Sequence, residues 1–211
     1  MKESIEVFEE NWKQYDEWFE KNRKIYLSEI KALEKIVLEG FGLEIGVGTG
    51  RFAQQLRIEI GLDPSINMLK VARKRGIKVV RGVGEFLPFN NESFDTVAII
   101  VTLCFVENPL EVLKEAKRVL KKKGVLIVGI IEKNSKWGIF YESKKRKSKF
   151  YKVANFYSAR EIIQLASKAG LKFREAYQTL FQGPKEFEKI EEPKEGFDEG
   201  GFIVLGFKKL N

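Results

Sequence analysis

The sequence has no histidine and only one cysteine among its 211 residues. Without histidine the chain cannot form a Ser-His-Asp or Cys-His catalytic set, or a zinc site of the HExxH type. The single cysteine, Cys104, excludes an intrachain disulfide and a zinc site built from several cysteines. We therefore expect no metal site, and a general base would have to be a carboxylate, a tyrosine, a lysine or Cys104.

Long apolar runs and an export signal are also missing. No apolar run approaches the roughly 20 residues that cross a bilayer. The acidic, mixed start of the chain, MKESIEVFEENW, lacks the basic and apolar regions of a signal peptide. These features predict a cytoplasmic protein without membrane contact, and the length suits a single domain over residues 1–211.

The net charge of +8 is spread over a chain in which 32% of the residues are charged, with both signs represented. Basic surface attracts nucleic-acid phosphates, so RNA is a possible partner. The strongest basic run, KKRKSK at residues 144–149, could contact RNA or an acidic acceptor, but a solvated loop is the simpler interpretation. A nucleic-acid partner is therefore possible without being favoured, and nothing in the sequence indicates an oligomeric state.

The periodicity divides the chain into a helical start and an alternating body. Within residues 1–39, Phe8, Trp12, Tyr15 and Phe19 share one face at helical spacing. From Gly42 onward, short apolar segments alternate with helical segments, which predicts a doubly wound α/β domain with a parallel sheet. Residues 132–157 are basic and aromatic and interrupt this alternation, so we interpret them as an insertion on the substrate side.

A glycine-rich turn, LEIGVGTG, follows the first expected strand and holds Gly46, Gly48 and Gly50. Ligands of doubly wound sheets bind outside the carboxyl ends of the strands, where this turn lies. A dinucleotide fingerprint, G-x-G-x-x-G, would need glycine where this chain has Arg51. The turn alone therefore predicts a nucleotide site, and Arg51 counts against a nicotinamide-dependent oxidoreductase.

Three segments in order, LEIGVGTGRFAQQL, IGLDPSINMLKVARKRG and VVRGVGEFLPF, resemble the motifs of the class I S-adenosylmethionine-dependent methyltransferases, especially the small-molecule branch. The resemblance runs from about residue 43 to 131, with a looser fit from 158 to the end. It implies a Rossmann-like, seven-stranded, mostly parallel sheet with an antiparallel last strand and an N-terminal helical lid at residues 1–39. It also implies S-adenosyl-L-methionine as cofactor and S-adenosyl-L-homocysteine as product.

The resemblance further implies a set of cofactor contacts. The glycine turn would lie under the methionyl part, Glu44 would receive the ammonium group, and Asp63 would accept hydrogen bonds from the ribose. Asp63 has an alternative role as a helix cap, which Ser65 could fill instead. The expected cofactor-binding residues are Glu44, Gly46, Val47, Gly48, Gly50, Asp63, Pro64, Met68, Gly84, Glu85 and Val101.

The sequence departs from the family pattern at two places. Many members have aspartate where this chain has Val83, so Glu85 or a backbone carbonyl would have to meet the adenine amino group. Met68 could border adenine or simply pack in the helix core. Many members also have histidine where this chain has Cys104 and Phe105, so histidine-assisted deprotonation is absent and no catalytic residue is assigned.

The methyl acceptor is expected to be a small molecule, because the DPPY-like motif of many nucleic-acid amino-methyltransferases is not visible. RNA or protein acceptors, and a cofactor-binding protein without activity, are the alternatives. Tyr15 and Trp18 are expected to close over the cofactor or acceptor, unless their helix only packs against the sheet. Residues 132–157 would supply the other wall of the acceptor pocket.

Overall fold

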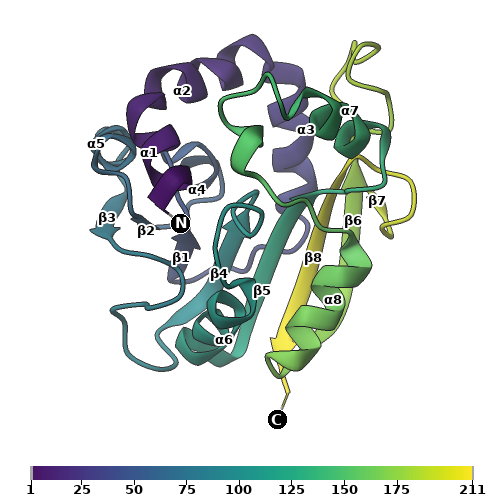
Figure 1. Ribbon diagram of the computed structural model, residues 1–211. Helices are drawn as coiled ribbons and strands as arrows, with labels where there is room; N and C mark the ends of the chain where they lie inside the picture. The colour runs from purple at the N-terminus through teal and green to yellow at the C-terminus, as the bar shows by residue number, and fades with distance from the viewer. Residues whose placement is uncertain (1, 211) are drawn as a thin grey trace.

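The computed structural model describes residues 2–210 and centres on an eight-stranded sheet in the order β3-β2-β1-β4-β5-β8-β6-β7 (Figure 1). Strands β1 to β5 run parallel, and β8 lies antiparallel between β5 and β6. The strands are β1 (Gly42–Ile45), β2 (Ile60–Asp63), β3 (Lys78–Arg81), β4 (Phe94–Ile100), β5 (Leu120–Ile131), β6 (Leu171–Thr179), β7 (Lys194–Glu195) and β8 (Phe202–Lys209). This confirms the mostly parallel sheet with an antiparallel last strand. The two-residue strand β7 brings the number of strands to eight, where the sequence predicted seven.

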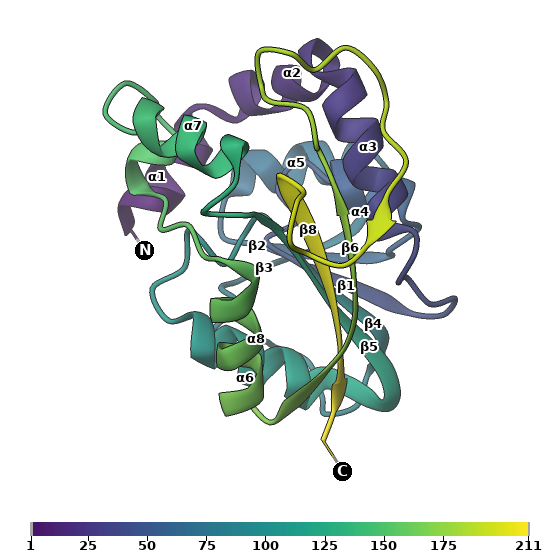
Figure 2. The same cartoon turned by 90° about the vertical axis from the view of Figure 1, so that its right-hand side faces the viewer.

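Helices cover both faces of the sheet. Helices α6 and α8 pack side by side on one face, and α3, α4 and α5 pack on the other (Figure 2). The helices are α1 (Lys2–Glu10), α2 (Trp12–Lys21), α3 (Arg23–Leu33), α4 (Arg51–Gln55), α5 (Ile66–Lys74), α6 (Pro109–Val119), α7 (Lys136–Lys144) and α8 (Ala159–Lys168), with a short 3-10 helix at Tyr151–Val153. Figure 1 shows α1, α2 and α7 gathered at one end of the sheet.

Side-chain caps fix where the helices around the sheet begin. The Ser65 hydroxyl accepts a hydrogen bond from the Met68 amide at the start of α5. At α8, Ser158 and Glu161 form a capping box with both of its hydrogen bonds present. Such caps satisfy the free amides of a first helical turn. Because α5 follows β2 after only two residues, this cap also fixes the end of β2.

The helical start predicted for residues 1–39 consists of three helices, α1, α2 and α3. The side chains of Asn11 and Asn22 donate hydrogen bonds to the carbonyls of Val7 and Trp18, four residues earlier. Asparagine competes in this way for the bonds that would continue a helix, which explains the two breaks. Residues 132–157, predicted to lack clear periodicity, contain α7, whose first turn is capped by Ser135.

Candidate active site

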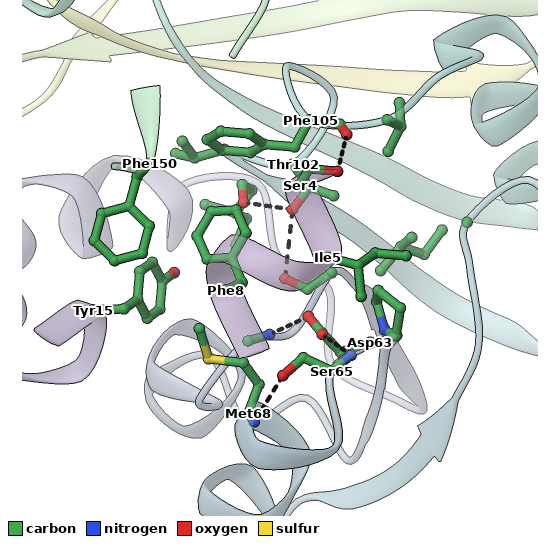
Figure 3. Close-up of a pocket in the computed structure, with 18 of the residues that line it drawn as sticks. Ser4, Ile5, Phe8, Tyr15, Asp63, Ser65, Met68, Thr102, Phe105 and Phe150 are labelled. Carbon is green, nitrogen blue, oxygen red and sulfur yellow. Dashed lines mark hydrogen bonds between the residues drawn. The ribbon is translucent and has the colours of Figure 1, made fainter. Parts of the chain in front are cut away.

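A cavity of about 370 Å³ lies at the carboxyl ends of the parallel strands (Figure 3). The ends of four neighbouring strands contribute to its wall, through Leu62 and Asp63 of β2, Ile45 and Gly46 at β1, Ile100 and Val101 at β4, and Ile131 of β5. This is the edge at which doubly wound sheets bind their ligands. The cavity is therefore the candidate active site.

The glycine turn forms the floor of this cavity. Gly46, Gly48 and Gly50 all have positive φ, at 74°, 52° and 81°. A Cβ at Gly46 would overlap the Thr102 side chain, and one at Gly48 would lie 3.3 Å from the Tyr15 ring. Only glycine combines this backbone conformation with such close neighbours. Gly46 and Gly48 line the cavity, whereas Gly50 faces α5.

Asp63 lines the cavity at the end of β2 and is 8% exposed. Its two carboxylate oxygens accept hydrogen bonds from the amides of Gly48 and Ser65, each at 2.9 Å. Burial raises the pKa of Asp63 to about 6, although these two bonds act in the opposite direction. Each oxygen keeps a lone pair for a ligand. Because Ser65 caps α5, Asp63 is available for the ligand role that the sequence left open.

Glu44 lies beneath the glycine turn and does not line the cavity. It is 1% exposed, and its Oε2 has no hydrogen-bond partner among residues 2–210. Burial raises the pKa of Glu44 well above its ordinary value; a bond from the Ala53 amide opposes this rise, and the charge of Asp63 adds to it. The structure therefore places Glu44 behind the turn, and Val47 and Gly50 are likewise off the cavity wall.

The remaining residues expected at the cofactor line the cavity, namely Pro64, Met68, Gly84, Glu85 and Val101. Val101 has a φ of 48°, although it is β-branched. Such a conformation is strained and clusters at functional sites. The Val101 amide is held there by the Gly129 carbonyl at 2.8 Å.

Aromatic side chains from four segments form a roof over the turn (Figure 3). Phe8 of α1 contacts Tyr15 of α2, Phe105 after β4, and Phe150 of the 132–157 segment, with ring centroids 5.7, 4.9 and 5.2 Å apart. Tyr15 and Trp18, the two residues expected in a lid, both line the cavity, and their role as a lid stays a prediction. The N-terminal helices and residues 132–157 therefore meet above one cavity.

A cluster of two arginines and one aspartate holds α2 against the glycine turn. Arg51 donates two hydrogen bonds of 2.9 Å to the carboxylate of Asp16, and Arg75 donates a third of the same length. Arg75 also donates to the Thr49 carbonyl within the turn. Burial raises the pKa of Asp16, but the arginine bonds outweigh this and lower it to about 2. In the sequence, Arg51 was notable only because it stands where the dinucleotide fingerprint has glycine. No sequence pattern near Arg51 predicts its contact with Asp16 on α2.

Several further residues line the cavity that the sequence did not single out, among them Glu29, Tyr141, Phe150 and Tyr151. Phe8 and Phe105, which the sequence analysis named without a role at the cofactor, also line it. Glu29 could have been found from the sequence, because it lies with Ile25, Tyr26 and Ile30 on the buried face of α3. A carboxylate on an apolar helix face is uncommon without a partner. The aromatic residues of the 132–157 segment had no periodicity that would predict which of them face the cavity.

Within residues 2–210, the acidic and cysteine side chains form no cluster of three that could hold a metal ion. The helices of this part are all too short or too polar to cross a membrane.

The fold and the cavity together define a nucleotide-binding α/β protein, and comparisons with known proteins narrow the class. Residues 43–128 match the family model of a methyltransferase domain. A structure from Thermotoga maritima, described as a SAM-dependent methyltransferase and possible histamine N-methyltransferase, has a TM-score of 0.94 and 48% identity over 97% of this chain and 99% of that chain.

Two curated relatives match most of this chain. An uncharacterized protein of Methanocaldococcus jannaschii is 50% identical over 98% of this chain and its own full length. Demethylmenaquinone methyltransferase of Staphylococcus aureus is 29% identical over 93% of this chain and 83% of its own. The chain belongs to the class I S-adenosylmethionine-dependent methyltransferases.

The cofactor of this family, S-adenosyl-L-methionine, fits the residues present. The glycine turn offers a floor that any Cβ at Gly46 would fill, and Asp63 offers carboxylate lone pairs at the next strand end. Glu44 adds an unsatisfied, buried carboxylate oxygen directly behind the turn. These groups complement a ligand that carries hydroxyl groups and positive charge.

Proposed function

We propose that the protein transfers the methyl group of S-adenosyl-L-methionine to a small molecule bound inside the cavity. The observation that carries this proposal is the aromatic roof, which leaves an internal space of about 370 Å³. That volume is within the range of small-molecule pockets. Among the described residues that line the cavity, none is lysine or arginine, whereas RNA binding relies on such residues at the phosphates.

We assign the cofactor to the β1, β2 and β4 ends of the cavity. Gly46 and Gly48 would admit its methionyl part, and Asp63 would bind the ribose hydroxyls. The adenine would be bordered by Met68 and Glu85, with Gly84 and Pro64 beside them. The bound cofactor supplies a methyl group on a positively charged sulfur, which leaves as a neutral thioether.

The chain itself contributes alignment and the exclusion of water. Holding two reactants in line can lower a barrier by several kcal/mol, on the order of 7 to 11 in well-oriented cases. We propose that residues 1–39 act as a lid through Tyr15 and Trp18, and that residues 132–157 form the acceptor wall. In support, both segments contribute rings to the roof.

Transfer of a radiolabelled methyl group from the cofactor tests this function. The protein would be incubated separately with a metabolite fraction below 1 kDa, with total RNA and with a protein extract, each from the same cells. We expect label in the metabolite fraction alone. Label that enters only RNA or protein would overturn the small-molecule proposal, and no label in any fraction, with cofactor bound, would favour a binding protein without activity.

A further inference from the structure

The cavity extends along the strand ends well beyond the part assigned to the cofactor. Its wall runs from Asp63 on β2, past β1 and β4, to Ile131 on β5. Neighbouring strands lie about 4.8 Å apart, so these ends are separated by roughly 14 Å. Beyond the strand ends the wall is completed by Glu29 of α3 and by Tyr141 and Tyr151 of the 132–157 segment.

Glu29 presents an unpaired carboxylate to this cavity. Its side chain is 4% exposed, and no residue of the range 2–210 donates a hydrogen bond to it or pairs with it. A buried carboxylate without a partner costs free energy, because it has lost its hydration. The same burial raises the pKa of Glu29 to about 8. Below about pH 8 the ligand-free protein therefore holds Glu29 protonated, and a ligand that supplied a positive charge would lower this pKa and stabilise the carboxylate.

The walls around Glu29 suit a cation as well. Tyr141 and Tyr151 lie with ring centroids 4.3 Å apart, and Tyr15, Trp18 and Phe19 line the same cavity. The faces of aromatic rings attract cations, most strongly where water is excluded. The charged residues that line the cavity, Glu29, Asp63 and Glu85, are all acidic. Among the described residues of this wall, none would balance an acceptor that carries a negative charge.

We propose that Glu29, together with Tyr141 and Tyr151, forms the subsite for a methyl acceptor that bears a small protonated amine. The proposal rests on the methyl-transfer function proposed above and names its acceptor class. A neutral or anionic acceptor would leave the Glu29 carboxylate unpaired or repelled. An ammonium group would pair with it and would also contact the aromatic faces.

Glu29 also has a place in the transfer step. A bound ammonium group has no lone pair, so one proton must leave the nitrogen before it can attack. Glu29 accepts that proton as a carboxylate and becomes a carboxylic acid. The freed lone pair forms the N–C bond to the methyl carbon while the S–C electron pair goes to sulfur. The product is an N-methylammonium ion, and the Glu29 proton then passes to water.

Calorimetric titration of the full-length protein saturated with S-adenosyl-L-homocysteine tests the subsite without turnover. The probes are 2-phenylethylamine and hexylamine, each compared with the alcohol of the same skeleton, 2-phenylethanol and hexanol. We expect both amines to bind at least tenfold more tightly than their alcohols. We expect Glu29→Gln to lose this preference and to bind S-adenosyl-L-homocysteine within twofold of the wild type. Glu34→Gln, an exposed carboxylate just past the end of α3, is the matched control and should change neither affinity.

The outcomes separate the two proposals. If the wild type does not bind S-adenosyl-L-homocysteine, both the proposed function and the amine subsite are overturned. If it binds S-adenosyl-L-homocysteine but binds amines no better than alcohols, or binds neither, only the amine subsite is overturned. An amine preference that persists in Glu29→Gln would overturn the role of Glu29. The comparison within the wild type needs no variant, and retained S-adenosyl-L-homocysteine binding shows that Glu29→Gln is folded.

Discussion

At the scale of single residues, the active-site cavity depends on positions where ordinary rules of folding are broken. Gly46 and Val101 have positive φ, and Glu29 and Glu44 are buried carboxylates without full pairing. Each such feature costs free energy in the ligand-free protein. They lie in or directly behind the same cavity, and a bound ligand is what could compensate for them.

Gly46→Ala is expected to weaken S-adenosyl-L-homocysteine binding at least tenfold. The new methyl group would overlap the Thr102 side chain, and alanine disfavours the φ of 74°. Gly76→Ala is the control, because Gly76 also has a positive φ, at 89°, but has open space around its Cβ position. Calorimetric titration measures the affinity of each variant for S-adenosyl-L-homocysteine. Equal losses of binding in the two variants would contradict a specific role for the turn.

Glu29→Gln is expected to become more stable relative to the wild type as the pH rises from about 4.5 to about 8. The Glu29 pKa is 4.5 in ordinary surroundings and about 8 in the folded protein. Between these values the folded state holds a proton that the unfolded state has released, so wild-type stability falls as the pH rises. Above about pH 8 both states are ionised, and the difference should level off.

Thermal unfolding at a series of pH values measures this difference, with Glu34→Gln as the exposed control. The charge of Glu29 acts on four titratable side chains packed around it, Tyr15, Tyr26, Tyr141 and Tyr151, and contributes to raising the pKa of each. Burial raises the pKa of each of these phenols above its usual value, so they stay neutral throughout the window. A constant difference between Glu29→Gln and wild type from pH 4.5 to 8 would contradict the buried, unpaired state of Glu29.

At the scale of elements, the lid is attached to the glycine turn through Asp16. This side chain on α2 joins Arg51 of α4 and Arg75 of α5, and all three are largely buried. Glu9 at the end of α1 makes a second attachment, accepting hydrogen bonds from Ser65 and from the Asn67 amide. The lid helices are thus connected to the same segments that hold Asp63 and the turn.

Asp16→Asn is expected to destabilise the protein by about 1 to 3 kcal/mol, because it leaves two partly buried arginines without their carboxylate. It should also speed amide hydrogen exchange in residues 12–21. Glu17→Gln is the matched control on the same helix, since within residues 2–210 the ion pair of Glu17 is with exposed Lys21. If Asp16→Asn exchanged no faster than Glu17→Gln, the attachment would have no role in holding α2.

The same contact gives a second, independent pH effect. The Asp16 pKa is about 2 in the folded protein and 3.8 in ordinary surroundings. A lowered pKa stabilises the folded state above pH 3.8, and this stabilisation is lost as the pH falls toward 2. Asp16→Asn should therefore differ from the wild type most at neutral pH and least near pH 2.

The elements also show what the sequence could and could not predict. Alternating apolar segments predicted the sheet, because local pattern fixes strands and the turns between them. The cofactor contacts at Gly46, Gly48, Asp63 and Val101 were implied by the family resemblance, and these residues line the cavity. The Asp16–Arg51 contact joins residues 35 positions apart, so no local sequence pattern could predict it. Which aromatic rings of residues 132–157 face the cavity likewise depends on packing between segments, which periodicity does not encode.

At the scale of the whole molecule, the cavity is bounded by segments that are far apart in the sequence, between residues 4 and 151. Residues from α1, from the strand ends and from the 132–157 segment share its wall, with Ser4 and Tyr151 as distant examples. A ligand that contacts all of them would add to the contacts that the aromatic roof, Asp16 and Glu9 already make between these segments. Ligand binding should therefore stabilise the whole fold and not just one loop.

S-adenosyl-L-homocysteine at about 100 times its Kd is expected to stabilise the protein by roughly 2.7 kcal/mol. For a chain of 211 residues this corresponds to a rise in Tm of roughly 5 to 10 °C, measured by thermal unfolding. NAD at the same concentration is the control and should give no rise. Arg51 stands where a dinucleotide site needs glycine, and its guanidinium is held by Asp16. A rise in Tm with NAD and none with S-adenosyl-L-homocysteine would contradict the cofactor assignment, because mass action stabilises the folded state only through a ligand that this state binds.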